Sequence, residues 1–229
     1  MENRISSPLV KRVSAAVVLC GLAVGSSAHA AAVLSFGQTS GGATVTATNN
    51  SANTQTLIGG SNVAVTLSQY AGGGAPISAF LNLSLTSTSA AMVVAGQILE
   101  PFSGSASFTS GIGGTGTNYL SASFTDFVFG TDGGSSLTLS ATEPPGTVSF
   151  TSSVLPASEL SDPRALSFGF ADVTGPASIV GSTLRGFTST VAGTVSAATT
   201  PVPEPATFAL VGVGLLAMGA VQYRRNSKI

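Results

Sequence analysis

The chain has 229 residues, with 8 Lys and Arg against 9 Asp and Glu, so its formal net charge is −1. Only 7% of its residues are charged, whereas an ordinary soluble domain has about 25%. Nucleic acid is excluded as a partner, because its binding depends on clustered Lys and Arg side chains that neutralise phosphates.

The first thirty residues are typical of a secretory signal peptide. Three basic residues lie within residues 1–12, and an apolar run follows at residues 13–25. This run is shorter than the roughly 20 residues that a membrane-spanning helix needs. Ala28 and Ala30 then stand at A-x-A spacing, so we expect the secretion machinery to export the chain and signal peptidase to cut before Ala31.

Cleavage there would remove the only cysteine and the only histidine, Cys20 and His29. The body that remains, residues 31–199, has no Trp or Lys, and its two Arg and seven acids give it a net charge of −5. A Ser–His or Cys–His pair would lack its base, and zinc would lack its usual ligands. We therefore predict a protein that is not an enzyme and has no cofactor. Polysaccharide hydrolysis by two of the carboxylates is the less favoured alternative.

Apolar residues with a period of two predict β-strands throughout the body. Val63, Val65 and Leu67 share one face of residues 62–67, and residues 80–86 repeat this pattern. The opposite faces carry mainly Ser, Thr and Asn, which indicates antiparallel strands with one buried and one solvated face. Further strands are predicted at residues 43–48, 102–110, 119–130, 136–141, 146–155, 164–172 and 186–197.

Turn-forming Gly and Pro residues separate these segments, for example at residues 71–76, 111–117 and 131–134. Eight to ten short strands without a soluble helix predict an all-β fold. We expect residues 31–199 to form one antiparallel β-sandwich or jelly roll.

The strand predicted at residues 119–130 leaves two alternatives open. Phe124 belongs to one apolar face, whereas Phe127 and Phe129 fall on the other. Either a β-bulge near Thr125–Asp126 returns them to the core, or this end of the strand is buried on both faces.

Three acids in or beside predicted turns are the candidate ligands of a structural calcium ion, which accepts carboxylates and backbone carbonyls: Asp126, Asp132 and Asp172. The alternative for Asp132 is that it favours the geometry of its turn. Tyr70 and Tyr119 would contact a glycan if exposed, and the alternative is that both are partly buried. A calcium- or glycan-binding adhesin is therefore a second hypothesis.

The C-terminal region combines a proline-rich segment, an apolar segment and a basic end. Residues 200–205 contain three prolines, which fix φ and remove hydrogen-bond donors, so an extended segment is expected. Residues 206–223 carry no charge, and as a helix they would measure about 27 Å at 1.5 Å per residue, close to the hydrocarbon core of a bilayer. Residues 224–229 would then stay in the cytoplasm as a stop-transfer signal, through Arg224, Arg225 and Lys228.

The order of these features resembles the PEP-CTERM sorting domain of Gram-negative bacteria. The resemblance is carried by Pro203, Glu204 and Pro205, the apolar span after them and the basic end. It implies that an exosortase recognises the tripeptide as a sorting and processing motif, after export across the inner membrane and transient anchoring by the C-terminus. It also implies a place at the cell surface or in the extracellular matrix, associated with exopolysaccharide and biofilm.

Overall fold

The computed structural model describes residues 30–39, 43–143 and 146–198, which lie in one compact unit. These residues form antiparallel strands and two short 3-10 helices, η1 (Ile112–Gly114) and η2 (Ala157–Glu159). The prediction of an all-β, antiparallel, sandwich-like fold is confirmed. The strands are β1 (Ala30–Gln38), β2 (Val45–Asn49), β3 (Thr56–Tyr70), β4 (Ile77–Ser87), β5 (Met92–Val94), β6 (Gln97–Thr109), β7 (Asn118–Thr131), β8 (Leu137–Glu143), β9 (Thr147–Thr151), β10 (Ser161–Ala171), β11 (Ile179–Val180), β12 (Thr183–Leu184) and β13 (Phe187–Ala198).

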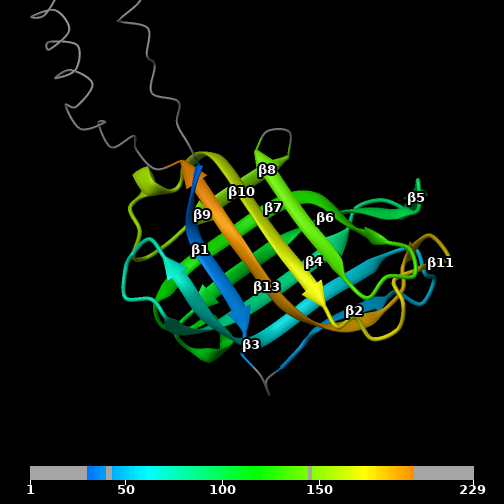
Figure 1. Ribbon diagram of the computed structural model, residues 1–229, viewed down its shortest axis with the longest axis horizontal. Helices are drawn as coiled ribbons and strands as arrows, with labels where there is room; N and C mark the ends of the chain where they lie inside the picture. Colours follow the sequence, from blue (N-terminus) through cyan, green and yellow to red (C-terminus); the bar gives the residue numbers. More distant parts are fainter. Residues whose placement is uncertain (1–29, 40–42, 144–145, 199–229) are drawn as a thin grey trace, which may run out of the picture. The chain divides into compact units, whose positions relative to one another are not determined.

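Eight strands of the main sheet close into a ring. Their order is β6-β4-β3-β1-β13-β10-β8-β7, and β7 pairs back with β6. In Figure 1, β1, β13, β10 and β8 form a near layer that crosses β3, β4, β6 and β7 behind it. The remaining strands of this sheet are additions to the ring: β2 pairs with β3 and β13, β5 pairs with β6, and β9 pairs with β7.

The core lies inside the ring and follows the predicted alternation. Val63, Val65 and Leu67 on β3 are at most 1% exposed. Aromatic rings from different strands meet edge to face at the centre, with Phe36 4.7 Å from Phe108 and 5.5 Å from Phe168 between ring centroids. Such pairs each add roughly 0.5–1.5 kcal/mol beyond the area that they bury, so the centre of the ring is specified by its aromatic residues.

The bulge predicted near Thr125–Asp126 is absent, and that alternative is wrong. The pairing of β6 with β7 continues without a shift from Gln97↔Thr131 to Phe108↔Leu120. Val128 is 1% exposed and continues the buried face of Phe124, so the alternation never changes phase. What changes is the partner strand, because β7 pairs with β9 along its first half and with β8 at residues 127–129.

Within the described ranges, no helix is long and apolar enough to cross a membrane. The predicted signal peptide, proline-rich segment, membrane span at residues 206–223 and basic end lie outside those ranges.

Candidate functional site

The ring has a seam between Thr125 and Phe127 of β7, where this strand stops pairing with β9 and begins to pair with β8. Strand β8 pairs with β10 along its whole length but with β7 only at residues 138–140. Strand β9 pairs with β7 alone among the described strands. One edge of β9 therefore has no strand hydrogen-bonded to it among the described residues, and Arg164 from β10 reaches this edge.

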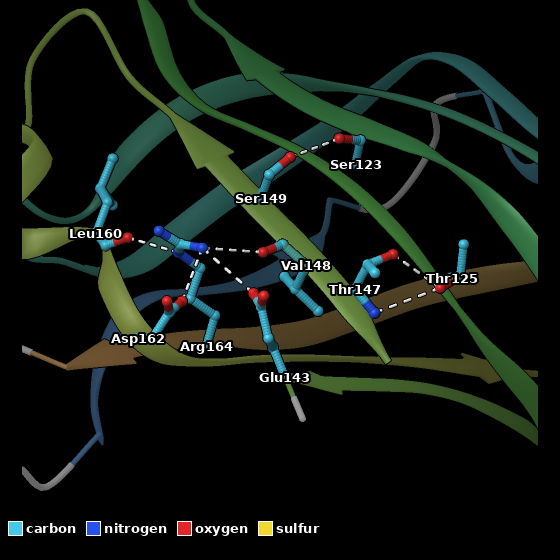
Figure 2. A network of polar contacts seen from close by, with 9 residues as sticks. All are labelled: Ser123, Thr125, Glu143, Thr147, Val148, Ser149, Leu160, Asp162 and Arg164. Atoms are coloured by element: carbon cyan, nitrogen blue, oxygen red, sulfur yellow. Dashed lines mark hydrogen bonds and ion pairs between the residues drawn. The ribbon is translucent and has the colours of Figure 1, made fainter. Parts of the chain in front are cut away.

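The guanidinium of Arg164 joins the strands on both sides of this seam (Figure 2). Its Nη1 donates to the backbone carbonyl of Val148 on β9 at 3.1 Å, and its Nε donates to the carbonyl of Leu160 at 2.6 Å. The same Nη1 forms ion pairs with Glu143 Oε2 at 3.2 Å and with Asp162 Oδ1 at 2.7 Å. One side chain thus satisfies a carbonyl of the β9 edge and holds two carboxylates.

The exposure of the three side chains determines how far water screens these contacts. Its side chain is 23% exposed, that of Glu143 is 32% exposed and that of Asp162 is 62% exposed. A partly buried guanidinium is screened less by water than a surface ion pair. We therefore assign Arg164 a structural role, in which it closes the seam and covers a strand edge that would otherwise be open to pairing.

Hydroxyl groups surround the same seam. Ser123 lies 2.6 Å from Ser149, and Thr125 lies 2.9 Å from Thr147, between hydroxyl oxygens. These pairs, visible in Figure 2, connect the outer faces of β7 and β9. Together with Arg164 and Glu143 they line an open cavity of about 460 Å³. Its walls can offer hydrogen bonds to a polar ligand, but it holds neither a histidine nor a cysteine.

A second polar centre is buried where β3, β6 and β12 meet. Glu100 is 0% exposed, and its carboxyl group accepts hydrogen bonds from the Thr56 hydroxyl at 3.0 Å and from the Leu184 backbone N–H at 2.9 Å. Burial raises the pKa of Glu100, and hydrogen bonds from Leu184, Thr56 and Ser87 oppose that rise. Through its bond to Leu184 on β12, the Glu100 carboxyl group connects the β11–β12 hairpin to the ring.

The sequence contained a signal for Glu100 that composition alone did not show. Ile98, Glu100 and Phe102 alternate on the same buried face, each at most 1% exposed. An acid at an apolar position of a period-two pattern is expected to be buried, and the position of Glu100 between Ile98 and Phe102 is that signal.

Two of the three proposed calcium ligands, Asp132 and Asp172, have side chains that the structure describes. No group of three or more His, Cys, Asp or Glu residues in the described part of the chain could hold a metal ion. Asp132 follows β7, where its backbone N–H donates to Gly96, and Asp172 follows β10 beside Thr190. The side chain of Asp126 lies outside what the structure describes.

Tyr70 does not form an exposed glycan-binding platform. It is 6% exposed, and its hydroxyl donates to the backbone carbonyl of Tyr119 at 3.0 Å. The two rings also pack edge to face, 5.6 Å apart between centroids. The alternative, in which both tyrosines are partly buried, is correct.

The predicted processing residues fall at the ends of the described domain. Ala30 and Ala31 begin β1 and pair with Ala198 and Ala197 at the end of β13. The other processing residues lie outside the described ranges: Ala28, Pro203, Glu204, Pro205, Arg224, Arg225 and Lys228.

Comparison with known protein families decides what this C-terminal region is. A family model of the PEP-CTERM protein-sorting motif matches residues 201–225. The chain carries a PEP-CTERM protein-sorting motif. The motif marks an exported protein that is anchored through its C-terminal signal and has an exosortase as its processing partner. No curated protein and no solved structure matches the chain.

The PEP-CTERM motif follows the folded domain closely. Strand β13 ends at Ala198, and the match begins at residue 201. The sorting motif therefore begins three residues after the last described strand.

Proposed function

We propose that this protein is a non-enzymatic component of the cell surface or extracellular matrix of a Gram-negative bacterium, associated with exopolysaccharide in a biofilm. The match to the PEP-CTERM motif at residues 201–225 is the observation that carries the proposal. In this proposal signal peptidase releases the N-terminus, and an exosortase then acts at Pro203–Pro205.

The arrangement of the termini supports processing at both ends. Because Ala30 pairs with Ala198, the first and last described residues of the domain lie side by side. Every strand of the ring lies between these two residues. The signal peptide and the sorting motif can therefore be removed without taking a strand from the sheet.

The polar chemistry of the domain supports a non-enzymatic role. The expected mature body has no histidine or cysteine to act as a nucleophile or base. Its most prominent pair of carboxylates, Glu143 and Asp162, shares one guanidinium nitrogen of Arg164. A glycosidase instead separates two carboxyl groups across the scissile bond and keeps one of them protonated. The Arg164 network is suited to holding strands together.

Intact mass spectrometry of the protein recovered from the cell surface and the medium tests the proposal. We expect a mass that begins at Ala31 and ends near Pro203–Pro205. The matched variant Glu204→Ala should remain full length at its C-terminus, because it removes the charge of the tripeptide. A wild-type mass that runs through Ile229, in a strain that processes its other PEP-CTERM proteins, would contradict exosortase processing.

A further inference from the structure

The outer face of the neighbouring strands β4, β6, β7 and β9 carries rows of hydroxyl groups. In the middle row, Ser84 pairs with Ser105, Ser105 with Ser123 and Ser123 with Ser149, and all four side chains are exposed. Directly paired residues of an antiparallel sheet place their side chains on the same face, so the row crosses four strands. The row on one side of it consists of Asn82, Ser107, Ser121 and Thr151. The row on the other side consists of Thr86, Ser103, Thr125 and Thr147.

These rows offer hydrogen bonds without offering charge. Apart from the amide of Asn82, every side chain in them is a Ser or Thr hydroxyl. Neighbouring strands are about 4.8 Å apart, so hydroxyl groups recur at that interval across the sheet. Within the pair Ser123 and Ser149 one hydroxyl donates to the other, which leaves the O–H of the second one able to donate outward. The face can therefore both donate and accept hydrogen bonds.

Two cavities hollow this face, and β6 contributes to the walls of both. The cavity of about 460 Å³ at the seam is lined on β6 by Ser103. A second cavity, of about 480 Å³, is lined on β6 by Ser105 and extends over β4 and β3 to β2. In this cavity Gly59 on β3 pairs with Ser84 and with Thr46 on β2, and it continues the middle row without a side chain. We call the two cavities and the three rows the hydroxyl trough.

The second cavity is lined by a residue with a buried, unpartnered hydrogen-bond donor. The Oδ1 atom of Asn82 accepts the backbone N–H of Asn62 at 3.0 Å, which sets the orientation of the amide. The Nδ2 atom of Asn82 is buried and has no hydrogen-bond partner among the described residues. Buried polar groups of folded proteins are almost always hydrogen-bonded. This donor therefore points to an acceptor from outside the chain.

The charge of the hydroxyl trough selects the class of ligand. The charged residues that line its cavities are Arg164 and Glu143, which form an ion pair at one end. A nucleic acid or another polyanion needs clustered cations, and a protein partner needs an interface with an apolar, aromatic-rich centre. An uncharged chain of sugars fits closely spaced hydroxyl groups, because each of its own hydroxyls both donates and accepts.

We propose that the hydroxyl trough binds an uncharged polysaccharide, laid across β9, β7, β6, β4 and β3. The inference rests on the proposed association with exopolysaccharide, and it adds the binding surface and the charge class of the ligand. The three rows hold no aromatic ring to stack on a sugar, so a single site binds weakly. Many copies bound along one polymer raise the overall affinity.

Biolayer interferometry of the purified full-length chain in detergent tests the charge class. The probes are the neutral and the acidic fractions of exopolysaccharide from the strain that makes the protein, separated by anion exchange. We expect the neutral fraction to bind about tenfold more tightly than the acidic one, because the trough has no free cation to reward a negative charge.

Removing the middle row tests the surface. We expect a triple variant to bind the neutral fraction about tenfold more weakly, since it loses three hydrogen-bonding groups: Ser84→Val, Ser105→Val and Ser123→Val. A matched triple variant removes a paired row from β8, β10 and β13 in the other layer and should change the affinity less than twofold: Ser140→Val, Ser167→Val and Thr194→Val.

Filling the trough tests its shape without removing a hydroxyl group. A Cβ atom at Gly59 would meet the carbonyl oxygen of Leu83 at 3.7 Å, an ordinary contact, so Gly59→Ile should fold and weaken binding about fivefold. Gly169→Ile on β10 is the matched control, because a Cβ atom there would meet the carbonyl oxygen of Ala192 at 3.9 Å. It should leave binding unchanged. Thermal unfolding followed by circular dichroism checks that each variant is folded.

The outcomes separate this inference from the proposed function. Equal weakening by the two triple variants, or equal binding by Gly59→Ile and Gly169→Ile, would overturn the trough as the binding surface and leave the association with exopolysaccharide standing. Tighter binding of the acidic fraction would overturn the charge class. A wild-type protein that bound neither fraction would contradict the association itself.

Discussion

The two free edges of the main sheet, β9 and β5, differ in how they are covered. The edge of β9 is covered from β10 by Arg164, which donates to the Val148 carbonyl and neutralises two acids beside it. The edge of β5 has half-exposed apolar side chains and an outward-facing backbone at Val93. One edge is covered by a charge network within the chain, and the other has no second strand beside it in the described part of the chain.

This difference matches the position of each edge in the domain. The β9 seam interrupts the ring itself, so leaving it open would expose core residues such as Val148 and Phe124, which are 2% and 3% exposed. Strand β5 extends β6 beyond the ring, and the ring stays closed whether or not β5 has a partner. An edge at a seam must be sealed for the domain to be stable, whereas a projecting edge can remain available.

Replacing Arg164 should have the largest effect and would remove the protection of the β9 edge. Arg164→Met leaves Glu143 and Asp162 without their shared cation and leaves the Val148 carbonyl without its donor. We expect the free energy of unfolding to fall by about 2–4 kcal/mol, as measured by urea unfolding followed by circular dichroism. The control is Arg185→Met at an exposed position, which should change it by less than about 0.5 kcal/mol. Equal effects of the two variants would mean that Arg164 does not seal the seam.

The buried carboxyl group of Glu100 should make the protein less stable as the pH rises. An ion-paired acid has the opposite effect, because its protein loses stability as the pH falls. Because burial raises the pKa of Glu100 above its ordinary value, the folded state binds its proton more tightly than the unfolded state does. The contribution of Glu100 to stability is therefore complete below its pKa in the unfolded state. It is lost as the pH rises through its pKa in the folded state.

The measurement is the urea midpoint of the wild type and of Glu100→Gln from pH 4 upward. The wild type should lose more stability than the variant over this range, because the variant has no proton to lose at this position. Parallel pH profiles for the two proteins would show that Glu100 does not titrate differently on folding.

The turn after β5 should respond to side chains that accept a left-handed backbone. Ala95 has a φ of 51°, a conformation that costs most L-residues roughly 1–2 kcal/mol and that Asn tolerates better. We expect Ala95→Asn to raise the free energy of unfolding by about 0.5–1 kcal/mol, measured by thermal or urea unfolding. Ala95→Val is the matched opposite, because a β-branched residue is strained there and should lower it. If both substitutions changed the free energy of unfolding in the same direction, the left-handed backbone at Ala95 would not be what decides their effect.

The hydroxyl pairs between β7 and β9 should have the smallest effect. Ser149→Ala removes the contact with Ser123, which both strands make on an exposed face. Cross-strand pairs of this kind contribute roughly 0.2–1 kcal/mol, so the expected loss is about 0.5 kcal/mol or less. If Ser149→Ala lowered the free energy of unfolding as much as Arg164→Met does, the hydroxyl pairs would stabilise the β9 edge as much as Arg164 does.

Sequence alone predicted the strands in which one face is buried without interruption. The patterns at residues 62–67 and 80–86 lie inside β3 and β4 with the predicted faces inward. It missed β1, because a register shift between Ala32 and Leu34 leaves Val33 and Leu34, two adjacent residues, both buried. A similar shift in β3 between Gly60 and Val63, with Asn62 at a φ of 54°, leaves Ile58 and Val63 both buried although they are five residues apart. Irregularities of this kind depend on the neighbouring strand, which the local pattern does not contain.

The candidate sites divide in the same way. The sorting motif at residues 201–225 was recognised because its information is contained in the order of adjacent residues. The Arg164 network was not, because Glu143, Val148 and Arg164 are separated in sequence and meet only where β8 and β9 part. Glu100 was counted among the acids, but its buried partners come from Thr56 and Leu184, on strands distant in sequence.

The sequence by itself determined the all-β class, the low charge and the sorting motif at the C-terminus, because composition, period-two alternation and short motifs are local properties. Only the tertiary structure decided that the sheet closes on itself, that Ala30 pairs with Ala198, and that β9 is sealed while β5 is open. These features depend on which strands become neighbours. That choice is made by the packing of the whole core, to which residues from every part of the described domain contribute.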